Sequence, residues 1–328
     1  MSYKNIYILG VGGSGMSSIA KYLKQKGDNV IGYDQRKSYV TNLLNQDGIK
    51  VVHTLDEITY KPESLYIYSS AIPIESDRFE DFYDKENVLS RPEYLKNLSE
   101  NQKIIGITGT HGKTSTTALL SHIFHFNNVN VSYLYGGITT FNGIGGHYGD
   151  PDQPLILETD EAFNTFEKIK ISDLLVLNVD SDHLDYFKNL DNYKDAFYKV
   201  MKNVTDNLVI NNDDLNIKSM KELKNPVSYG KDTSADFKVQ SPGNFKYENN
   251  KYEIKSDIIG DHFKANMLGA IILALLNGIE IKDSLNAIES FAGVKRRIEL
   301  IGISKGVLIY DDYGHHPTEM EATITALK

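Results

Sequence analysis

Two glycine-rich segments constrain the fold of this chain more than any other feature of its sequence. The first, residues 10–15, lies between a strand-like apolar run at 6–9 and a helix-like run at 14–26. The second, residues 109–114, follows another apolar run at 103–108 and precedes a further helical pattern. A strand, a glycine turn and a helix in succession form the repeating unit of a parallel sheet covered by helices. The sequence therefore predicts an α/β fold.

The length favours two or three domains, because 328 residues exceed what one core usually holds, and a hydrophobic fraction of 41% supplies the cores. We expect an N-terminal Rossmann-like parallel-sheet domain at 1–99 and a P-loop-type central domain at 100–296. The polar segment 97–102 is the predicted linker between them. Residues 297–328 hold one more strand-like run and one more helix-like run, and are predicted to begin a third α/β domain.

The other predicted elements follow the same alternation. We expect strands at 30–33, 49–52, 65–69, 155–157, 174–178, 208–211 and 307–310, and helices from about Ser115, at 264–277, at 282–291 and at 317–328. Residues 237–255 instead alternate polar and apolar side chains around Asn249 and Asn250, a pair that favours a tight turn. The central domain is therefore predicted to carry a small antiparallel appendage.

The charge balance excludes several classes of partner. Lys and Arg number 35 against 44 Asp and Glu, so the net charge is −9 and gives no general attraction for nucleic acid or anionic membranes. The longest uncharged apolar run, 270–276, is too short to span a bilayer, and the N-terminus lacks the apolar stretch of a secretory signal. The absence of cysteine excludes disulfides and thiolate metal sites. We expect a cytoplasmic protein without membrane insertion.

The first glycine segment fits the pattern G-x-G-x-x-G, in which glycine lets backbone amides approach a diphosphate at a helix N-terminus. Asp34 ends the next predicted strand, 19 residues after Gly15, where an acid usually binds a ribose or a neighbouring group. This pattern indicates a nucleotide without specifying which one. An NAD enzyme fits it, and so does a tight turn with no ligand.

The second glycine segment is similar to a P-loop. Its amides and Lys113 would surround phosphates, and the Thr114 hydroxyl would face Mg²⁺. Ile107 occupies the first glycine position of the general P-loop pattern, so the usable glycine is Gly109 and a shorter loop is expected. The alternative, a chance Gly-Lys-Thr in a turn, fits the flanking strand and helix less well.

Acidic and histidine side chains follow the predicted strands. Glu158 ends a strand and is the main Mg²⁺ candidate, whereas Asp160 and Glu161 behind it fit solvated loop acids as well as ligands. His183 lies among acids after the strand at 174–178, where it would ligate a metal or contact a substrate anion. The ends of parallel strands are therefore the predicted site.

Two segments near the C-terminus complete the pattern. Residues 295–297 offer cations to phosphate, and residues 311–317 place acids and histidines after a strand. Together, these segments resemble the Mur ligases of peptidoglycan synthesis, and in particular the branch of that family that adds L-alanine. The resemblance rests on strings that occur in the family's order, namely 8–17, 69–73, 108–114, 178–183, 293–297 and 311–319.

The resemblance implies that the N-terminal domain binds UDP-N-acetylmuramate rather than NAD. The residues that match this role are Gly12, Ser14, Gly15, Asp34 and Ser70. It also implies a central ATPase domain, with L-alanine as the second small-molecule substrate. The chain would be an ATP-dependent, amide-forming ligase of the bacterial cytoplasm, either a monomer or a homodimer.

The resemblance also implies roles for residues of the central and C-terminal segments. Those that match the ATP site are Gly109, Thr110, His111, Gly112, Lys113, Thr114, Asn266, Arg297 and Asp312. Those that match the Mg²⁺ sites are Thr114, Glu158 and His183, and the implied catalytic residues are Lys113, His183, Arg297 and His315. Tyr313 and His316 lie with His315 where the family approaches the amino acid.

The chain departs from the family pattern in places. Phe263 stands where many relatives have asparagine, which bears on the adenine contact, and Phe197 stands where later ligases of the pathway use a carbamylated lysine. The alanine-adding branch also lacks that lysine. Family members continue well beyond the position of Lys328, so we expect a truncated chain that binds its ligands and forms little product. The alternatives are a ligase that joins a preformed tripeptide, and a non-catalytic nucleotide-binding module.

Overall fold

The computed structural model describes residues 3–162, 165–182, 184–220 and 222–328. Its strands are β1 (Asn5–Leu9), β2 (Val30–Tyr33), β3 (Lys50–Val52), β4 (Ser64–Tyr68), β5 (Val88–Ser90), β6 (Ile104–Thr108), β7 (Ser132–Thr139), β8 (Gly143–His147), β9 (Leu155–Glu158), β10 (Asp173–Val176), β11 (Asn207–Asn211), β12 (Val227–Gly230), β13 (Phe237–Ser241), β14 (Asn244–Tyr247), β15 (Asn250–Glu253), β16 (Glu299–Ser304) and β17 (Val307–Asp311). Its α-helices are α1 (Ser14–Lys26), α2 (Tyr39–Gln46), α3 (Arg91–Asn101), α4 (Lys113–Phe126), α5 (Leu184–Phe187), α6 (Leu190–Lys202), α7 (Leu215–Lys218), α8 (Asp261–Leu276), α9 (Ile281–Glu289) and α10 (Pro317–Ala326). No helix in these described ranges combines the length and the apolar character that a membrane span requires.

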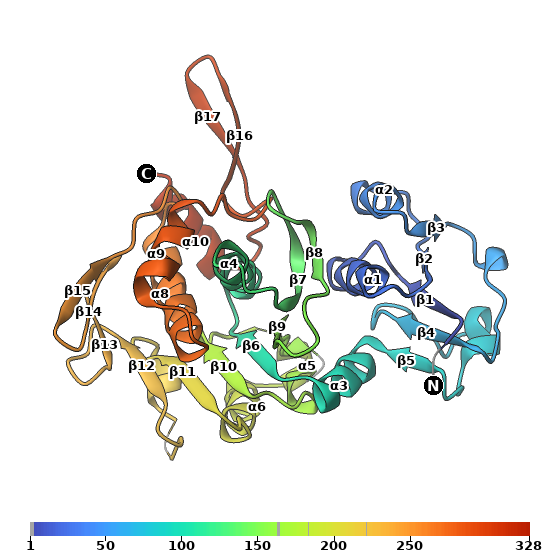
Figure 1. The fold of residues 1–328 in the computed structure, drawn as a ribbon, viewed down its shortest axis with the longest axis horizontal. Coiled ribbons are helices and arrows are strands. Elements are labelled where there is room, and N and C mark those ends of the chain that lie inside the picture. The colour runs from blue at the N-terminus through green and yellow to red at the C-terminus, as the bar shows by residue number, and fades with distance from the viewer. Residues whose placement is uncertain (1–2, 163–164, 183, 221) are drawn as a thin grey trace.

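Two large sheets form the framework of the molecule (Figure 1). The N-terminal sheet is parallel and has the strand order β3-β2-β1-β4-β5. The central sheet has the order β15-β14-β13-β12-β11-β10-β6-β9-β7-β8, parallel in its middle and antiparallel at both edges. A separate hairpin of β16 and β17 projects from the body (Figure 1). The α/β class is confirmed, as is an antiparallel extension of the central sheet.

The alternation of side chains along the central strands produces two buried faces. In β10, Leu174 and Val176 join the core that includes Phe197 of α6, whereas Leu175 joins the core formed with α4 and α8. Successive strand residues point to opposite faces, so a strand that is apolar throughout is buried on both sides. This packing brings the C-terminal ends of β6, β9 and β10 to one edge of the sheet, where the predicted site residues follow them.

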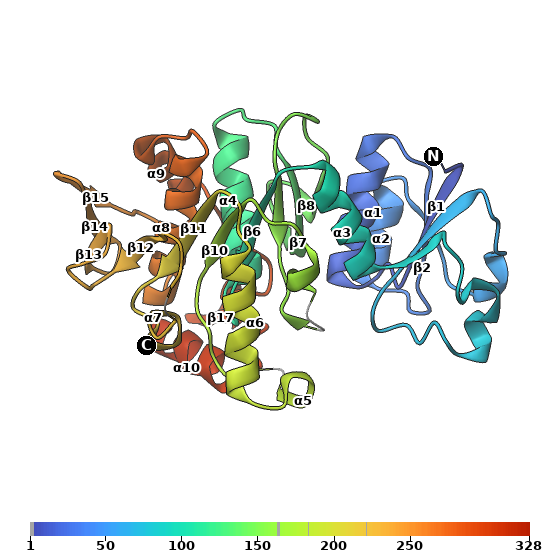
Figure 2. The same cartoon turned by 90° about the horizontal axis from the view of Figure 1, so that it is seen from below.

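Helix α1 joins the two sheets. It contacts β1 and β2 of its own sheet and also β7 and β8 of the central sheet, and these elements lie side by side in Figures 1 and 2. The approach is close because β8 contains glycine: a Cβ atom added at Gly146 would collide with the backbone of Ser18 in α1. The ammonium group of Lys21 adds hydrogen bonds to the carbonyl oxygens of Asn142 and Ile144. The N-terminal sheet is therefore seated on the central one.

The prediction of a linker at 97–102 is wrong, because most of this segment is the last part of helix α3. The Ser90 hydroxyl accepts a hydrogen bond from the backbone N–H of Glu93, and the Glu93 carboxylate accepts one from the Ser90 N–H. Tyr94 and Leu95 are buried and fix the helix on its sheet. The side chains of Asn97, Glu100 and Asn101 face solvent, so this part of the helix resembles a linker in sequence. The predicted domain limit at residue 99 falls inside this helix and stays a prediction.

The antiparallel edge near 237–255 differs from the prediction in its turns. Tyr247 pairs with Asn250, so the turn consists of Glu248 and Asn249, one residue earlier than expected, and Glu248 has a φ of 52°. The sequence also does not predict the β13–β14 hairpin, nor elements β7, β8, α2, α6 and β16. Glycine weakens the strand signal of β7 and β8, and close packing rather than strand propensity explains their formation.

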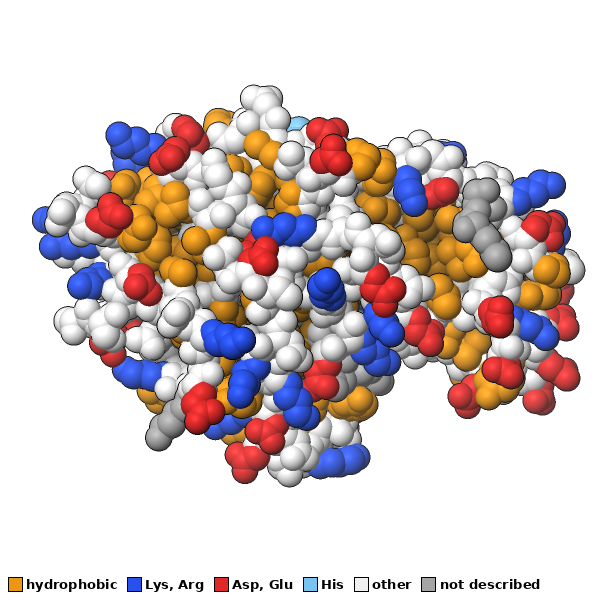
Figure 3. Space-filling model, turned by 60° about the horizontal axis from the view of Figure 1, so that its bottom comes forward, with side chains coloured by type: hydrophobic (Ala, Val, Ile, Leu, Met, Phe, Trp, Pro, Cys, Tyr) orange, Lys and Arg blue, Asp and Glu red, His pale blue; other side chains and the backbone are white. Residues whose placement is uncertain are grey.

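The surface mixes charges of both signs. Acidic and basic side chains are interspersed on the face that Figure 3 shows. Several large apolar side chains are exposed on the β16–β17 hairpin and α10, with exposed fractions of 67% at Ile303 and 53% at Ile324, and others are exposed singly, such as Leu215 at 80%. Among the described residues, the C-terminal segment therefore has the densest group of exposed apolar side chains.

We predict that Gly146→Ala destabilises the protein by about 1–3 kcal/mol, because the added methyl group forces α1 away from β8. Gly302→Ala is the matched control: a Cβ atom there meets nothing within 4 Å, so a change of less than about 0.5 kcal/mol is expected. Midpoints of chemical unfolding measure both effects. Equal midpoints for the two variants would show that α1 is not seated tightly on β8.

Candidate functional site

Three adjoining cavities lie along one edge of the central sheet. The N-terminal cavity, of about 310 Å³, is lined by the first glycine segment, the loop after β4 and residues after β9. The loop cavity, of about 190 Å³, is lined by the second glycine segment and the acids after β9. The α8 cavity, of about 500 Å³, lies between that segment, the start of α8, and α10. Asp160 lines the first two cavities, and Arg297 lines the last two, so the three form a row.

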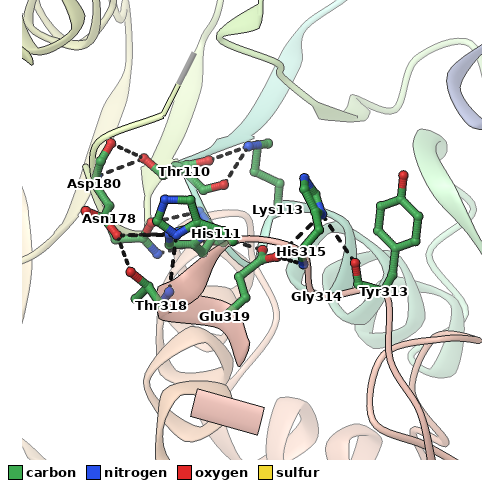
Figure 4. Close-up of polar contacts among 12 residues, drawn as sticks. Thr110, His111, Lys113, Asn178, Asp180, Tyr313, Gly314, His315, Thr318 and Glu319 are labelled. Carbon is green, nitrogen blue, oxygen red and sulfur yellow. Dashed lines mark hydrogen bonds and ion pairs between the residues drawn. The ribbon is translucent and has the colours of Figure 1, made fainter. Parts of the chain in front are cut away.

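Asn178, which follows β10, fixes the conformation of the second glycine segment. The His111 N–H donates to Asn178 Oδ1 at 2.8 Å, and Asn178 Nδ2 donates to the His111 carbonyl at 3.0 Å (Figure 4). Gly109 has a φ of 142° and lies so close to Asn178 that a Cβ atom would be 3.1 Å from its backbone. Gly112, with a φ of 85°, is the residue immediately before helix α4. The protein itself therefore shapes a helix N-terminus that favours an anion.

Lys113 is a partly buried cation of the loop cavity, with a side chain that is 14% exposed. Its Nζ donates to the carbonyl oxygens of Gly109 at 2.6 Å and Thr110 at 3.0 Å, and to Glu161 Oε1 at 2.9 Å. Burial alone would lower the pKa of Lys113, but the Glu161 and Asp160 carboxylates raise it above its ordinary value. The lysine is therefore charged at neutral pH, with its donors directed at oxygen atoms as a phosphate contact requires.

Thr114 and Glu158 place two oxygen-bearing side chains beside Lys113. Thr114 Oγ1 donates to Glu158 Oε1 at 2.6 Å, and the Gly136 N–H donates to Glu158 Oε2 at 2.6 Å. Burial and the nearby Asp160 charge raise the pKa of Glu158. Hydroxyl and carboxylate oxygens are ligands that Mg²⁺ prefers, and a cation would offset the cost of burying this carboxylate. His183, the third predicted ligand, lies outside the described residues.

The C-terminal segment docks on the second glycine segment through His111. His111 Nδ1 lies 3.2 Å from Glu319 Oε1, and His111 Nε2 lies 3.1 Å from Asp180 Oδ2 (Figure 4). Thr318 Oγ1 donates to the same Asp180 oxygen at 2.8 Å. Burial would lower the pKa of His111, but its hydrogen bonds to the two acids raise it, and the His111 hydrogen bond lowers the pKa of Glu319 to about 2. The imidazolium form thus bridges two parts of the chain.

His111, Asp180 and His316 also meet a geometric criterion for a metal site, because their ligand atoms lie within 4.8 Å of one another. Each nitrogen of His111 faces a carboxylate, however, which favours the protonated ring. His316 Nε2 lies 3.1 Å from the Ser181 carbonyl, and His316 Nδ1 accepts from the Thr318 N–H at 3.3 Å. The ring nitrogens of His111 and His316 therefore already have carboxylate or backbone partners.

Only three of the five residues predicted for the sugar-nucleotide site line the N-terminal cavity. Ser14, Gly15 and Ser70 line it. Gly12 and Asp34 do not, and bond each other instead: the Gly12 N–H donates to Asp34 Oδ2 at 2.9 Å. A Cβ atom at Gly12 would lie 2.7 Å from that oxygen, so the Asp34 side chain leaves no room for a side chain at residue 12. A contact of Asp34 with a ribose stays a prediction.

The structure brings most of the other predicted residues to the two remaining cavities. The loop cavity is lined by Thr110, Gly112, Lys113, Thr114, Arg297 and His315, and the α8 cavity by His111, Gly112, Asn266, Arg297 and Asp312. Gly109 lines neither and acts through the loop's conformation. Phe263, at the position that departs from the family pattern, also lines the α8 cavity.

The sequence analysis does not name two charged residues of the site, Arg91 and Glu319, as individual candidates. Arg91 Nη1 lies 2.8 Å from Asp160 Oδ2, and Glu319 contacts His111. Arg91 follows β5, and the strands of a parallel sheet end at the same edge as the first glycine segment. The sequence analysis predicts no strand at 88–90, so a search for charged residues after the predicted strands would not have found Arg91.

Comparison with known families agrees with this geometry. The Mur ligase middle domain matches residues 107–274, the catalytic domain of the Mur ligase family matches 5–103, and the Mur ligase glutamate ligase domain matches 296–328. The chain belongs to the Mur ligase family. This Mur ligase is 34% identical to a UDP-N-acetylmuramate–L-alanine ligase of Clostridium botulinum, over 99% of this chain and 74% of that protein. A ligase of the same name from Cytophaga hutchinsonii is 32% identical, again over 99% and 74%.

Solved structures include similar proteins. The UDP-N-acetylmuramate–alanine ligase of Thermotoga maritima has a TM-score of 0.84 and 25% identity, covering 99% of this Mur ligase and 77% of that chain. A murein peptide ligase of Psychrobacter arcticus has a TM-score of 0.78 at 23% identity, covering 99% and 76%, and shares the fold.

We predict that His111→Gln lowers the melting temperature more at about pH 5.5 than at about pH 9. The pKa of His111 is raised in the folded state, so its ion pairs stabilise fully below the unfolded pKa of about 6.5, and this contribution is lost as the pH rises through the folded value. The lowered pKa of Glu319 preserves the pair until the pH falls toward about 2. Calorimetric scans at both pH values measure the difference.

The matched control is His125→Gln, because His125 is an exposed histidine of the neighbouring helix α4. It is expected to show the same small effect at both pH values. A His111 variant that behaves in the same way would contradict the bridging role.

Proposed function

We propose that this Mur ligase joins L-alanine to the carboxyl group of UDP-N-acetylmuramate with the hydrolysis of ATP, in peptidoglycan precursor synthesis. The observation that carries the proposal is the row of cavities, in which a nucleotide-type glycine loop and a P-loop-type segment meet at Asp160. The similar proteins from Clostridium botulinum and Thermotoga maritima, both named as alanine ligases, support it. Since both nucleotides are made inside bacteria, we place the reaction in the bacterial cytoplasm.

The assignment of ligands to cavities follows from the lining residues. UDP-N-acetylmuramate would occupy the N-terminal cavity, with its diphosphate near Ser14 and Gly15 at the start of α1. The nucleoside part of ATP would occupy the α8 cavity, whose volume of about 500 Å³ is typical of a small-molecule site, with Asn266 and Asp312 in its wall. The phosphates of ATP would then reach Lys113 in the loop cavity.

In the first step, a carboxylate oxygen of UDP-N-acetylmuramate attacks the γ-phosphorus of ATP, and ADP leaves. The product is an acyl phosphate. Two anions have to approach each other, so the barrier is largely electrostatic. Lys113 and Arg297 both line the loop cavity and would supply positive charge where the anions meet.

In the second step, the amine of L-alanine attacks the acyl carbon, phosphate leaves, and the amine nitrogen loses a proton. His315 lines the loop cavity and is 74% exposed, so a small amino acid has access to it from solvent. Tyr313, whose carbonyl oxygen lies 3.3 Å from His315 Nδ1, is the neighbouring candidate for this substrate.

Mg²⁺ fits where Thr114, which lines the loop cavity, meets Glu158, which lines the N-terminal cavity. Thr114 and Glu158 would hold it through hydroxyl and carboxylate oxygens, and His183 is a further proposed ligand outside the described residues. A bound ion supplies charge neutralisation for the β- and γ-phosphates.

We predict that, in an intact enzyme, Lys113→Ala slows ATP-dependent ligation by roughly 10²- to 10³-fold, because one electrostatic donor at the transferred phosphate is lost. The release of ADP with both co-substrates present measures the rate. Lys199→Ala, which removes an exposed lysine of α6, is expected to leave it unchanged. If the two variants turn over ATP equally, Lys113 has no role at the phosphate.

A tripeptide-joining ligase is the second candidate, because the structurally similar Psychrobacter arcticus protein is a murein peptide ligase. We predict that L-alanine, supplied together with an equal concentration of the tripeptide, is the acceptor that enters the product. Mass spectrometry of the UDP-linked product distinguishes the two. A predominant tripeptide adduct would replace the alanine assignment.

A further inference from the structure

Arg91 lies between two of the ligand cavities and has no part in the steps described above. It is the first residue of α3 in the N-terminal part of the chain. Its Nη1 lies 2.8 Å from Oδ2 of Asp160, which follows β9 in the central part, and the Arg91 side chain is only 20% exposed. Arg91 lines the N-terminal cavity, and Asp160 lines both this cavity and the loop cavity. The ion pair therefore stands where the two proposed co-substrates approach each other.

The guanidinium group of Arg91 packs against the first turn of α1. A Cβ atom added at Gly15 would lie 2.9 Å from Arg91 Nε, 3.1 Å from Cζ and 3.2 Å from Nη2. Gly15 is thus a position where any side chain would displace the guanidinium. Gly15, which the sequence pattern assigns to a diphosphate contact, thus also leaves space for the Arg91 guanidinium beside the N-terminus of α1.

One edge of this guanidinium has no hydrogen-bond partner among the described residues. Arg91 Nε is buried and unpaired, and Nη2 donates to no described group, whereas Nη1 is held by Asp160. The Nε–Nη2 edge is one that binds carboxylates and phosphates through two parallel hydrogen bonds. Proteins rarely bury a donor without a partner, which indicates that a ligand completes this site.

We propose that the Nε–Nη2 edge of Arg91 binds an oxyanion of the nucleotide sugar in the N-terminal cavity, a role that rests on the proposed function. Asp160 holds the opposite side of the guanidinium, so the two donors are oriented before the ligand arrives. The diphosphate above the start of α1 and the carboxylate that awaits activation both present paired oxygen atoms to such a fork. The experiment below distinguishes these two sources.

Titration calorimetry with UDP, UDP-N-acetylglucosamine and UDP-N-acetylmuramate tests the contact, because only the last ligand carries the carboxylate. Arg91→Gln is expected to raise the Kd roughly 10- to 100-fold, which is the effect of losing hydrogen bonds to a charged group. A rise for all three ligands assigns the contact to the diphosphate, and a rise for UDP-N-acetylmuramate alone assigns it to the carboxylate. Lys96→Gln, which removes an exposed charge from the same helix, is the control with unchanged Kd.

Two further variants separate ligand binding from structural support. Arg91→Lys keeps the charge and loses the fork, so it is expected to weaken binding as well, whereas the Kd for ATP stays the same in both Arg91 variants. Asp160→Asn breaks the ion pair but leaves the guanidinium, and is expected to weaken UDP-sugar binding less than Arg91→Gln. An equal loss in these two variants would mean that the ion pair only supports the fold.

Wild-type affinity for all three ligands in both Arg91 variants would overturn the proposal. Failure of the unmodified chain to bind any of the three would instead overturn the proposed function.

Discussion

Charge compensation at the end of β9 is the interaction on which the site depends. Glu158, Asp160 and Glu161 lie within four residues of one another, and all three carboxylates act on the pKa of Lys113. Each acid has a partner from a different element: Glu158 accepts from Thr114, Asp160 from Arg91, and Glu161 from Lys113. Without these partners, the repulsion of three clustered carboxylates would oppose folding.

The same contacts define how the site is divided among the parts of the chain. The glycine loops and the acids belong to the two large sheets, which α1 holds together. Part of the wall of the α8 cavity, by contrast, comes from α10, which reaches the glycine loop through Thr318 and Glu319. The position of α10 therefore controls access to the proposed nucleoside pocket, while the phosphate loop keeps its shape through Asn178.

The parts of the fold that the sequence predicts well are those with strong local signals. The β1–α1–β2 unit follows from its apolar runs and Gly27, and helix α1 has the predicted bounds. The sequence does not predict sheet edges whose stability comes from distant contacts, and β7 and β8 are examples. Their glycines disfavour a strand when the sequence is taken alone, whereas in the structure they allow α1 to pack closely. The partial burial of α3 likewise hides a helix in a polar sequence.

The candidate site shows the same division. Lys113, Thr114 and Glu158 are adjacent to recognisable strand ends, and the structure brings them together. The pairing of Asp34 with Gly12 and of Arg91 with Asp160 depends on the register of separate strands, so no local pattern reveals it. The sequence indicates which residue types gather at the edge of the sheet, and tertiary packing decides which of them face one another.

Gly136 connects the two ligand sites in a way that bears on how precisely the reactants align. Its N–H holds Glu158, and a Cβ atom there would lie 3.0 Å from the Ser14 hydroxyl. One residue without a side chain thus lies between Ser14, in the loop proposed for the sugar nucleotide, and Glu158, which accepts from Thr114 in the loop proposed for the triphosphate. A methyl group at this position would make the Ser14 side chain shift by a few tenths of an ångström, so, on the proposed function, it would disturb the alignment of the two substrates more than the binding of either one.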